Sequence, residues 1–135
     1  MPFDTVDKLL FDSSVCGIIE FRIYSKNLYG ITDMNQEAEK ITGYDINEIL
    51  SLPHKIDISK MIYDEDVNIV VNEIASLVLT GKSEKIEYRI ISRSGDIHWI
   101  SGKFILVENT DFVESAPSCI INSFVCIDDR KEAEE

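Results

Sequence analysis

The sequence lacks the features that would assign it to several common classes of protein. It has only three cysteines, Cys16, Cys119 and Cys126, and no pair of them has the CxxC spacing. Neither a disulfide framework nor a zinc site is predicted, and we expect buried, reduced thiols in a reducing cytosol. No apolar run approaches the roughly 20 residues of a membrane-spanning helix, and the first residues do not have the layout of a signal peptide.

Positive charge is also scarce. The 135 residues include 13 Lys and Arg against 25 Asp and Glu, which gives a formal net charge of −12. Nucleic-acid binding requires clustered basic side chains, so we expect no nucleic-acid partner and no direct insertion into a membrane. The sequence does have an ordinary globular composition, with 44% hydrophobic residues, and a length that suits one domain.

Two of the predicted helices have recognisable caps. Asn35 can cap a short helix that Gly43 ends. A longer helix, with Asp64 as its expected cap and Gly81 at its end, is predicted to lie against a sheet. Its apolar positions are Val67, Ile69, Val70, Val71, Ile74, Leu77, Val78 and Leu79.

The pattern of apolar residues predicts five strands, of which the last is apolar on both faces. Two precede the short helix, in "GIIEFRIY" and "LYGITDMN", and three end the chain at about 83–92, 97–108 and 118–128. This order of elements predicts an α+β fold, in which a five-stranded antiparallel sheet carries the short helices and the long helix on one face.

The segment "EYRIISRSGDIHWI" predicts a hairpin between two of these strands. We expect Ile90 to pair with Ile100, which leaves residues 94–96 as a three-residue loop that contains a glycine. The same register places Trp99, the only tryptophan, opposite Ile91 on the other face of the sheet.

Four segments, in this order along the chain, resemble the PAS domain, a sensory module of bacterial kinases and cyclases. "NQEAEKITGYDINEIL" resembles the family's Asn-x-x-Ala-x-x-x-Thr-Gly-Tyr-x-x-x-Glu-Ile-Leu segment, and "MIYDEDV" is similar to its usual start of the long helix. "EYRIISRSGDIHWI" resembles its Glu-Tyr-Arg…Gly…Trp hairpin, and "CIDDRKEAEE" its closing Asp-Ile-Thr-x-Arg-Lys-x-Ala-Glu. The resemblance covers roughly residues 10 to 134.

The resemblance implies a single PAS domain and a division of the chain. Residues 1–15 would form an N-terminal helical segment, 16–128 the core, and 129–135 the start of a signalling helix. The closing motif departs from the family, since Cys126 occupies the position of the first Asp and Asp128 that of the Thr.

The implied function is sensory. The chain would belong to a larger cytoplasmic signalling protein whose output domain, a histidine kinase or a GGDEF diguanylate cyclase, lies outside it, so the chain itself would not be an enzyme. The resemblance also implies a homodimer and a small-molecule ligand. The alternative is a ligand-free interaction and dimerisation module, in which the space between helix and sheet is a filled core.

The residues give little support for catalysis or for the family's usual cofactors. No motif activates a cysteine beside His54 or His98, so a nucleophilic enzyme is not expected. The haem-binding members use an axial His on the long helix, and residues 65–80 contain none. The adduct-forming flavin members use a Cys that the corresponding "DISKMIYD" lacks. Haem and adduct-forming flavin are disfavoured, and the cofactor is unknown.

The candidate site residues form three groups. A pocket between the long helix and the sheet would be lined by Val70, Ile74, Tyr88, Ile90, Ile100, Gly102, Phe104 and Asn122. The dimer face would include Leu9, Leu10, Phe11, Ile91 and Trp99. Asp128 and Arg130 would relay a signal from the sheet to the helix that follows, unless this end of the chain is a frayed tail.

Overall fold

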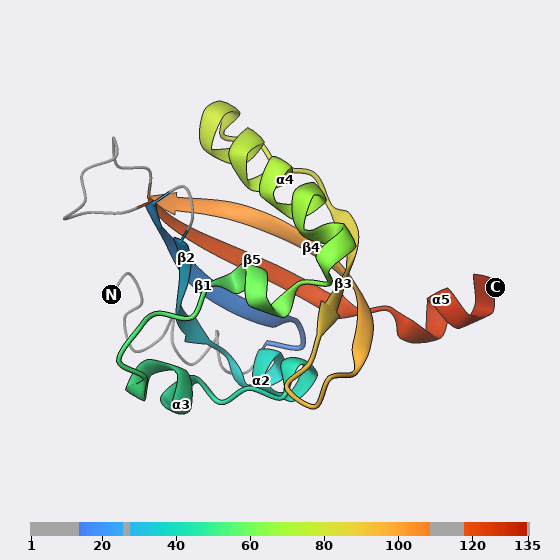
Figure 1. Ribbon diagram of the computed structural model, residues 1–135. Helices are drawn as coiled ribbons and strands as arrows, with labels where there is room; N and C mark the ends of the chain where they lie inside the picture. Colours follow the sequence, from blue (N-terminus) through green and yellow to red (C-terminus); the bar gives the residue numbers. More distant parts are fainter. Residues whose placement is uncertain (1–13, 26–27, 109–117, 135) are drawn as a thin grey trace.

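The computed structural model describes residues 14–25, 28–108 and 118–134, and its centre is a five-stranded antiparallel sheet (Figure 1). The strand order across the sheet is β2-β1-β5-β4-β3. The strands are β1 (Gly17–Ser25), β2 (Leu28–Met34), β3 (Ile86–Ile91), β4 (Ile97–Glu108) and β5 (Ser118–Cys126). This arrangement confirms the predicted α+β fold.

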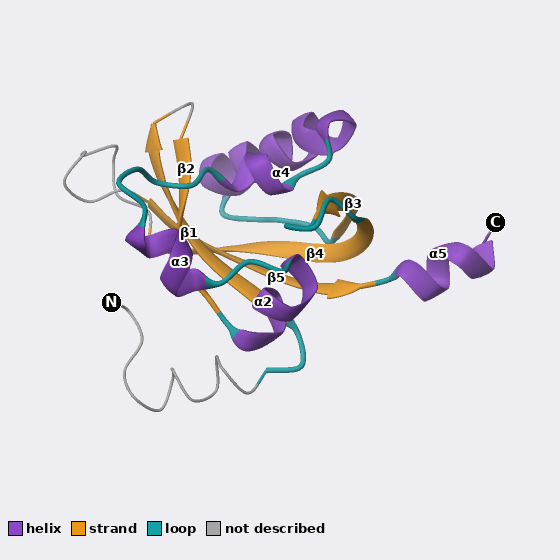
Figure 2. Cartoon of the chain, turned by 60° about the horizontal axis from the view of Figure 1, so that its bottom comes forward, coloured by secondary structure: helices purple, strands orange, loops and turns teal. Residues whose placement is uncertain are grey.

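The helices pack on one face of the sheet, which we call the inner face; it carries Phe21, Ile100 and Phe124. The helices are α2 (Gln36–Thr42), α3 (Ile46–Ser51), α4 (Val67–Thr80) and α5 (Asp128–Glu134), with 3₁₀ turns η1 (Ile58–Met61) and η2 (Asp64–Asp66). The hydrophobic core lies between the inner face and α2, α3, η1 and α4. Helix α5 instead leaves the body of the domain (Figure 2).

Helix α4 starts later than the sequence predicts. The proposed cap, Asp64, is wrong because a 3₁₀ turn comes first and the cap position falls at Asp66. The Asp66 carboxylate is bound by Arg89 of β3. The predicted end is confirmed, because Gly81 takes the left-handed conformation with φ of 75°.

The buried stripe of α4 is narrower than its apolar sequence suggests. Val70, Ile74 and Leu77 are buried against the core, whereas Ile69 is 49% and Leu79 is 84% exposed. A helix on the surface of a sheet buries only one face, so apolar residues outside that face meet solvent. Among the helices of the described ranges, none is both long and apolar enough to span a membrane.

The hairpin of β3 and β4 has a different register from the predicted one. Ile90 pairs with His98 rather than with Ile100, and Trp99 lies opposite Arg89. The predicted register is therefore wrong by two residues. Because side chains alternate with a period of two, this shift leaves every side chain on its expected face of the sheet.

The glycine in the hairpin loop explains the register. Ser92 N–H donates to Asp96 O over 2.8 Å and Gly95 N–H donates to Ser92 O over 2.9 Å, so the three-residue loop is 93–95. In this loop type the third residue takes a positive φ, and Gly95 has φ of 92°. The predicted loop placed the glycine second, where the positive φ is not required.

Asn35 joins the first strand to the first helix of the core. Its side-chain oxygen accepts hydrogen bonds from Ile18 N–H at 2.8 Å and Ala38 N–H at 2.9 Å, and its amide nitrogen donates to Cys16 O at 2.9 Å. The residue is fully buried. It thus caps α2, as predicted from the sequence, and also fixes the backbone at the start of β1.

We expect Asn35→Ala to lower the free energy of unfolding by about 3 kcal/mol, because it removes a helix cap and leaves buried backbone groups unpaired. The matched control is Asp45→Ala, which removes a cap of α3 that is exposed to solvent. This control should cost about 1 kcal/mol. Chemical denaturation of both variants measures the difference, and equal losses would contradict the prediction.

Candidate functional site

A small cavity lies in the core, between the inner face of the sheet and the segment that leads into α4. Its volume is about 10 Å³, which is room for about one water molecule. The residues that line it are Ile19, Thr42, Ile58, Met61, Ile62, Tyr88, Ile90, Ile100, Phe104, Asn122 and Phe124. Five of the predicted pocket residues are therefore brought together here: Tyr88, Ile90, Ile100, Phe104 and Asn122.

The other three predicted pocket residues belong to the packing around the cavity. Val70 and Ile74 are buried in the face of α4 that meets the core. Gly102 lies beside the polar pair of the cavity, since a Cβ atom there would come within 3.1 Å of both Asn122 Oδ1 and Tyr88 Oη. A larger residue at this position would press on that pair, so the glycine leaves room for it.

Tyr88 and Asn122 form the polar part of an otherwise apolar cavity. The Asn122 amide nitrogen donates to the Tyr88 hydroxyl over 2.7 Å, and both residues are almost completely buried. Burial raises the pKa of Tyr88, although the hydrogen bond from Asn122 lowers it in part, so the phenol stays neutral. Asn122 Oδ1 is buried and finds no hydrogen-bond partner among the residues that the structure describes.

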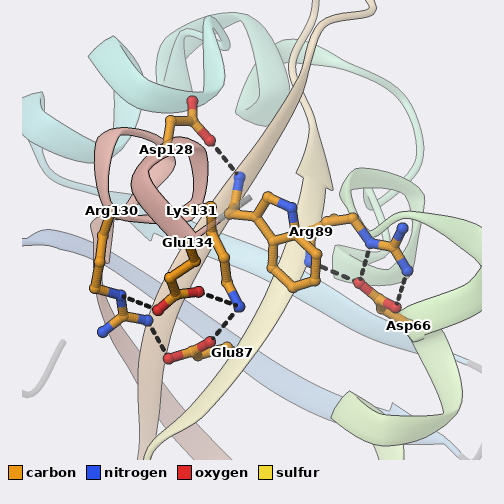
Figure 3. Close-up of polar contacts among 8 residues, drawn as sticks. Asp66, Glu87, Arg89, Asp128, Arg130, Lys131 and Glu134 are labelled. Atoms are coloured by element: carbon orange, nitrogen blue, oxygen red, sulfur yellow. Dashed lines mark hydrogen bonds and ion pairs between the residues drawn. The ribbon is translucent and has the colours of Figure 1, made fainter.

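A second arrangement of polar groups joins the sheet to α5 (Figure 3). Asp128 Oδ1 accepts a hydrogen bond from the Trp99 backbone N–H at 2.7 Å, and its Oδ2 lies 2.7 Å from His98 Nδ1. Burial alone would raise the pKa of Asp128, but its hydrogen bonds with His98, Trp99 and Cys126 outweigh this effect and lower the pKa. Asp128 therefore accepts hydrogen bonds at the position where the family has a threonine.

Glu87 of β3 holds the other side of α5. Lys131 Nζ lies 2.8 Å from Glu87 Oε1, and Arg130 pairs with the same carboxylate. The hydrogen bond from Lys131, followed by that from Arg130, lowers the pKa of Glu87. Both predicted relay residues, Asp128 and Arg130, thus contact the sheet. Glu87 and Lys131 were not predicted, although an acidic strand residue and the basic run "RK" could have indicated them.

Arg89 connects α4 to the same junction. Its guanidinium binds both oxygens of Asp66, at 2.9 Å from Nε and 2.8 Å from Nη2, and its backbone N–H donates to Asp66 at 2.7 Å. These hydrogen bonds lower the pKa of Asp66 despite its burial. The Arg89 guanidinium also lies over the rings of Tyr63 and Trp99, 4.3 and 4.9 Å from their centres.

The face of the sheet away from the helices, which we call the outer face, carries the predicted dimer contacts. Leu9, Leu10 and Phe11 lie outside the described residues. Ile91 and Trp99 are half-buried, and Lys131 Nζ lies 4.5 Å from the centre of the Trp99 ring. Four apolar residues that are not among the predicted dimer contacts are more exposed on this face than Ile91 and Trp99, with exposed fractions of 40–51%: Ile97, Ile105, Val107 and Val125.

The three cysteines differ in their surroundings. Cys119 is buried and Cys16 is half-buried, but Cys126 is exposed. The expectation of a buried thiol is therefore wrong for Cys126, because it lies at the end of β5 where the core stops.

Comparisons with known proteins agree with this geometry. The family model of the PAS fold matches residues 31–114. The PAS domain of a protein from Colwellia psychrerythraea has a similar structure, with a TM-score of 0.73 and 17% identity over 94% of this chain and 100% of that one. A sensory box histidine kinase/response regulator from Burkholderia thailandensis is also similar, with a TM-score of 0.64 and 22% identity over 94% of this chain and 88% of that one.

A third similar structure is a PAS domain, in complex with ethanol, of a LuxR-family transcriptional regulator from Burkholderia thailandensis. Its TM-score is 0.62 and its identity 16%, over 93% of this chain and 98% of that one. At these identities the likeness to solved structures establishes the fold alone. A search of curated proteins found no match.

The Tyr88–Asn122 pair can be tested by a double-mutant cycle. Tyr88→Phe should lower the free energy of unfolding by about 2 kcal/mol, because it leaves the Asn122 amide without its partner. Asn122→Leu should cost less, since it also removes the unpaired oxygen. The double variant, with both polar groups replaced, should be close to the wild type. Denaturant titrations give the four values, and additive losses would contradict the prediction.

Proposed function

The chain belongs to the PAS family, and we propose that it is a sensory domain that binds a small molecule beside Tyr88 and Asn122 and passes the binding event to α5. The proposal rests on Asn122, which lines the cavity and whose buried Oδ1 has no hydrogen-bond partner among the described residues. A buried acceptor without a partner costs about 1–3 kcal/mol. A ligand that donates a hydrogen bond to this oxygen would remove that cost.

The lining of the cavity indicates the class of ligand. Apart from Thr42, Tyr88 and Asn122, every residue that lines it is apolar. A charged ligand would lose its hydration without a compensating partner. The site therefore favours a small neutral molecule with one hydrogen-bond donor and an apolar part. A similar PAS structure that contains ethanol supports a ligand of this size and chemistry.

The small size of the cavity supports the idea that ligand binding changes the conformation of the core. Because about 10 Å³ admits only about one water molecule, a larger ligand must move the walls apart. Binding would then select an expanded conformation of the core over the closed one. Because Tyr88 belongs to strand β3, its displacement would also move the residues next to it in the strand.

Strand β3 supplies the route to α5. Tyr88 faces the cavity, and its neighbours Glu87 and Arg89 face outward. Glu87 binds Lys131 and Arg130 of α5, and Arg89 binds Asp66 at the start of α4. A shift of the strand at Tyr88 would therefore change the ion pairs that hold α5. In the full-length protein we propose that α5 leads to a cytoplasmic output domain, a histidine kinase or a diguanylate cyclase, so that the chain regulates catalysis elsewhere.

A ligand-free dimerisation module is the second candidate, and the outer face would supply its dimer contact. Ile97, Ile105, Val107 and Val125 form an exposed apolar set on strands β4 and β5. Solvent-exposed apolar patches on a sheet are commonly covered by a partner. A homodimer through this face is compatible with either candidate function.

Titration of ¹⁵N-labelled protein with ethanol and propanol tests the sensory proposal. We expect chemical-shift changes at Tyr88 and Asn122 and, through β3, in residues 128–134 of α5. Asn122→Leu should abolish both sets of changes because the hydrogen-bond acceptor is lost. Ser123→Ala is the matched control, since Ser123 is the next residue on the opposite face of β5. Equal shifts in Asn122→Leu would overturn the ligand site, and unchanged α5 signals would overturn the relay.

Sedimentation equilibrium tests the homodimer. Ile105→Glu places a charge on the outer face and should raise the dimer dissociation constant at least about tenfold. The control is Ile69→Glu on α4, because Ile69 is 49% and Ile105 48% exposed. Trp99→Ala should have a smaller effect, since Arg89 and Lys131 already cover part of the ring. A dimer unaffected by Ile105→Glu would refute this interface.

A further inference from the structure

Three potential metal ligands meet where the sheet passes into α5. Atoms of His98, Cys126 and Asp128 that can bind a metal all lie within 4.8 Å of one another. We propose that these three side chains bind a divalent transition-metal ion of the zinc class. The site lies apart from the cavity at Tyr88 and does not depend on the proposed ligand. The spacing of the cysteines along the chain did not indicate it.

The strand register places these residues together. Cys126, at the end of β5, pairs with Ile100 of β4, and His98 lies two residues before Ile100 on the same face. Cys126 and His98 are therefore diagonal neighbours across two antiparallel strands. The chain then continues into α5, whose first residue is Asp128. The backbone hydrogen bond from Ile127 N–H to Trp99 O, at 2.9 Å, holds this continuation against β4.

The three ligand types suit zinc. Zinc binds cysteine sulfur, histidine nitrogen and carboxylate oxygen in tetrahedral sites, and an incomplete protein set leaves one position for water. Asp128 is already oriented by the Trp99 backbone N–H, which binds its other carboxylate oxygen at 2.7 Å. A hydrogen bond to the free oxygen of a ligating carboxylate is a usual support of metal sites.

The geometry requires a small adjustment. In a tetrahedral site with bonds of about 2.0–2.1 Å, the nitrogen and oxygen ligands lie roughly 3.3 Å apart. His98 Nδ1 and Asp128 Oδ2 now lie 2.7 Å apart. Both side chains are about one third exposed, at 31% and 35%, and Cys126 is exposed, so they can separate and an ion can reach them.

Metal binding would change the proton count by one. Cys126 releases its thiol proton as its sulfur binds the ion, and His98 would bind through Nδ1 as a neutral imidazole that carries its proton on Nε2. The ion would then connect β4, the end of β5 and the first turn of α5. Its consequence is a fixed direction for α5 where this helix leaves the domain (Figure 1).

The test uses the full chain, reduced and freed of metal. Calorimetric titration should show one Zn²⁺ per chain. Co²⁺ should give a thiolate-to-metal charge-transfer band and the visible spectrum of a four-coordinate ion. It should also quench the fluorescence of Trp99, the only tryptophan. Cys126→Ser should remove the charge-transfer band, and His98→Gln and Asp128→Asn should each weaken Zn²⁺ binding about tenfold or more.

Two control variants separate this site from adventitious binding. Cys16→Ser and His54→Gln change the same residue types elsewhere in the chain and should leave binding unchanged. Circular dichroism should show that each variant is folded. The proposal is overturned if the wild type does not bind one equivalent, if the charge-transfer band persists in Cys126→Ser, or if either control abolishes it.

Discussion

The alternation of side chains along β3 is the constraint on which the cavity and the α5 junction both depend. Tyr88 points to the inner face and reaches the cavity, so Glu87 and Arg89 must point to the outer side. One pairs with α5 and the other with Asp66. Three successive residues therefore contact three different parts of the domain. None of them can be displaced alone, because they belong to one strand that is hydrogen-bonded to the neighbouring strand.

The Arg89–Asp66 pair makes α4 part of the same unit. The Asp66 side chain is only 6% exposed and that of Arg89 25%, so removal of either partner would leave a poorly solvated charge. The Arg89 guanidinium binds the Asp66 carboxylate in a bidentate arrangement, and the Arg89 backbone N–H adds a third hydrogen bond. These hydrogen bonds offset the cost of burying the two charges. The pair also explains why the Asp66 side chain does not cap α4, because its carboxylate faces β3 instead.

For the hairpin of β3 and β4, sequence patterns predicted which face of the sheet each residue occupies but not the full set of contacts. Tyr88, Ile90, Ile100, Phe104 and Asn122 were assigned to a common pocket because period-two alternation survives an error of two in register. The register itself depends on the conformation of one loop glycine, which the alternation does not report. The cluster of His98, Cys126 and Asp128 was missed because it arises from the pairing of β4 with β5, not from spacing along the chain.

A nearly filled core is compatible with sensing if the closed state carries a local cost. The buried Asn122 oxygen, which has no partner within the described part of the chain, supplies such a cost of about 1–3 kcal/mol, and a hydrogen-bond donor in the cavity would remove it. Such an energy difference shifts an equilibrium between two conformations by about 5- to 150-fold. Replacing Asn122 by an apolar side chain would remove both the cost of the buried acceptor and the energy difference between the two conformations. The same atom that lowers stability is thus the one through which a neutral ligand could distinguish the two conformations.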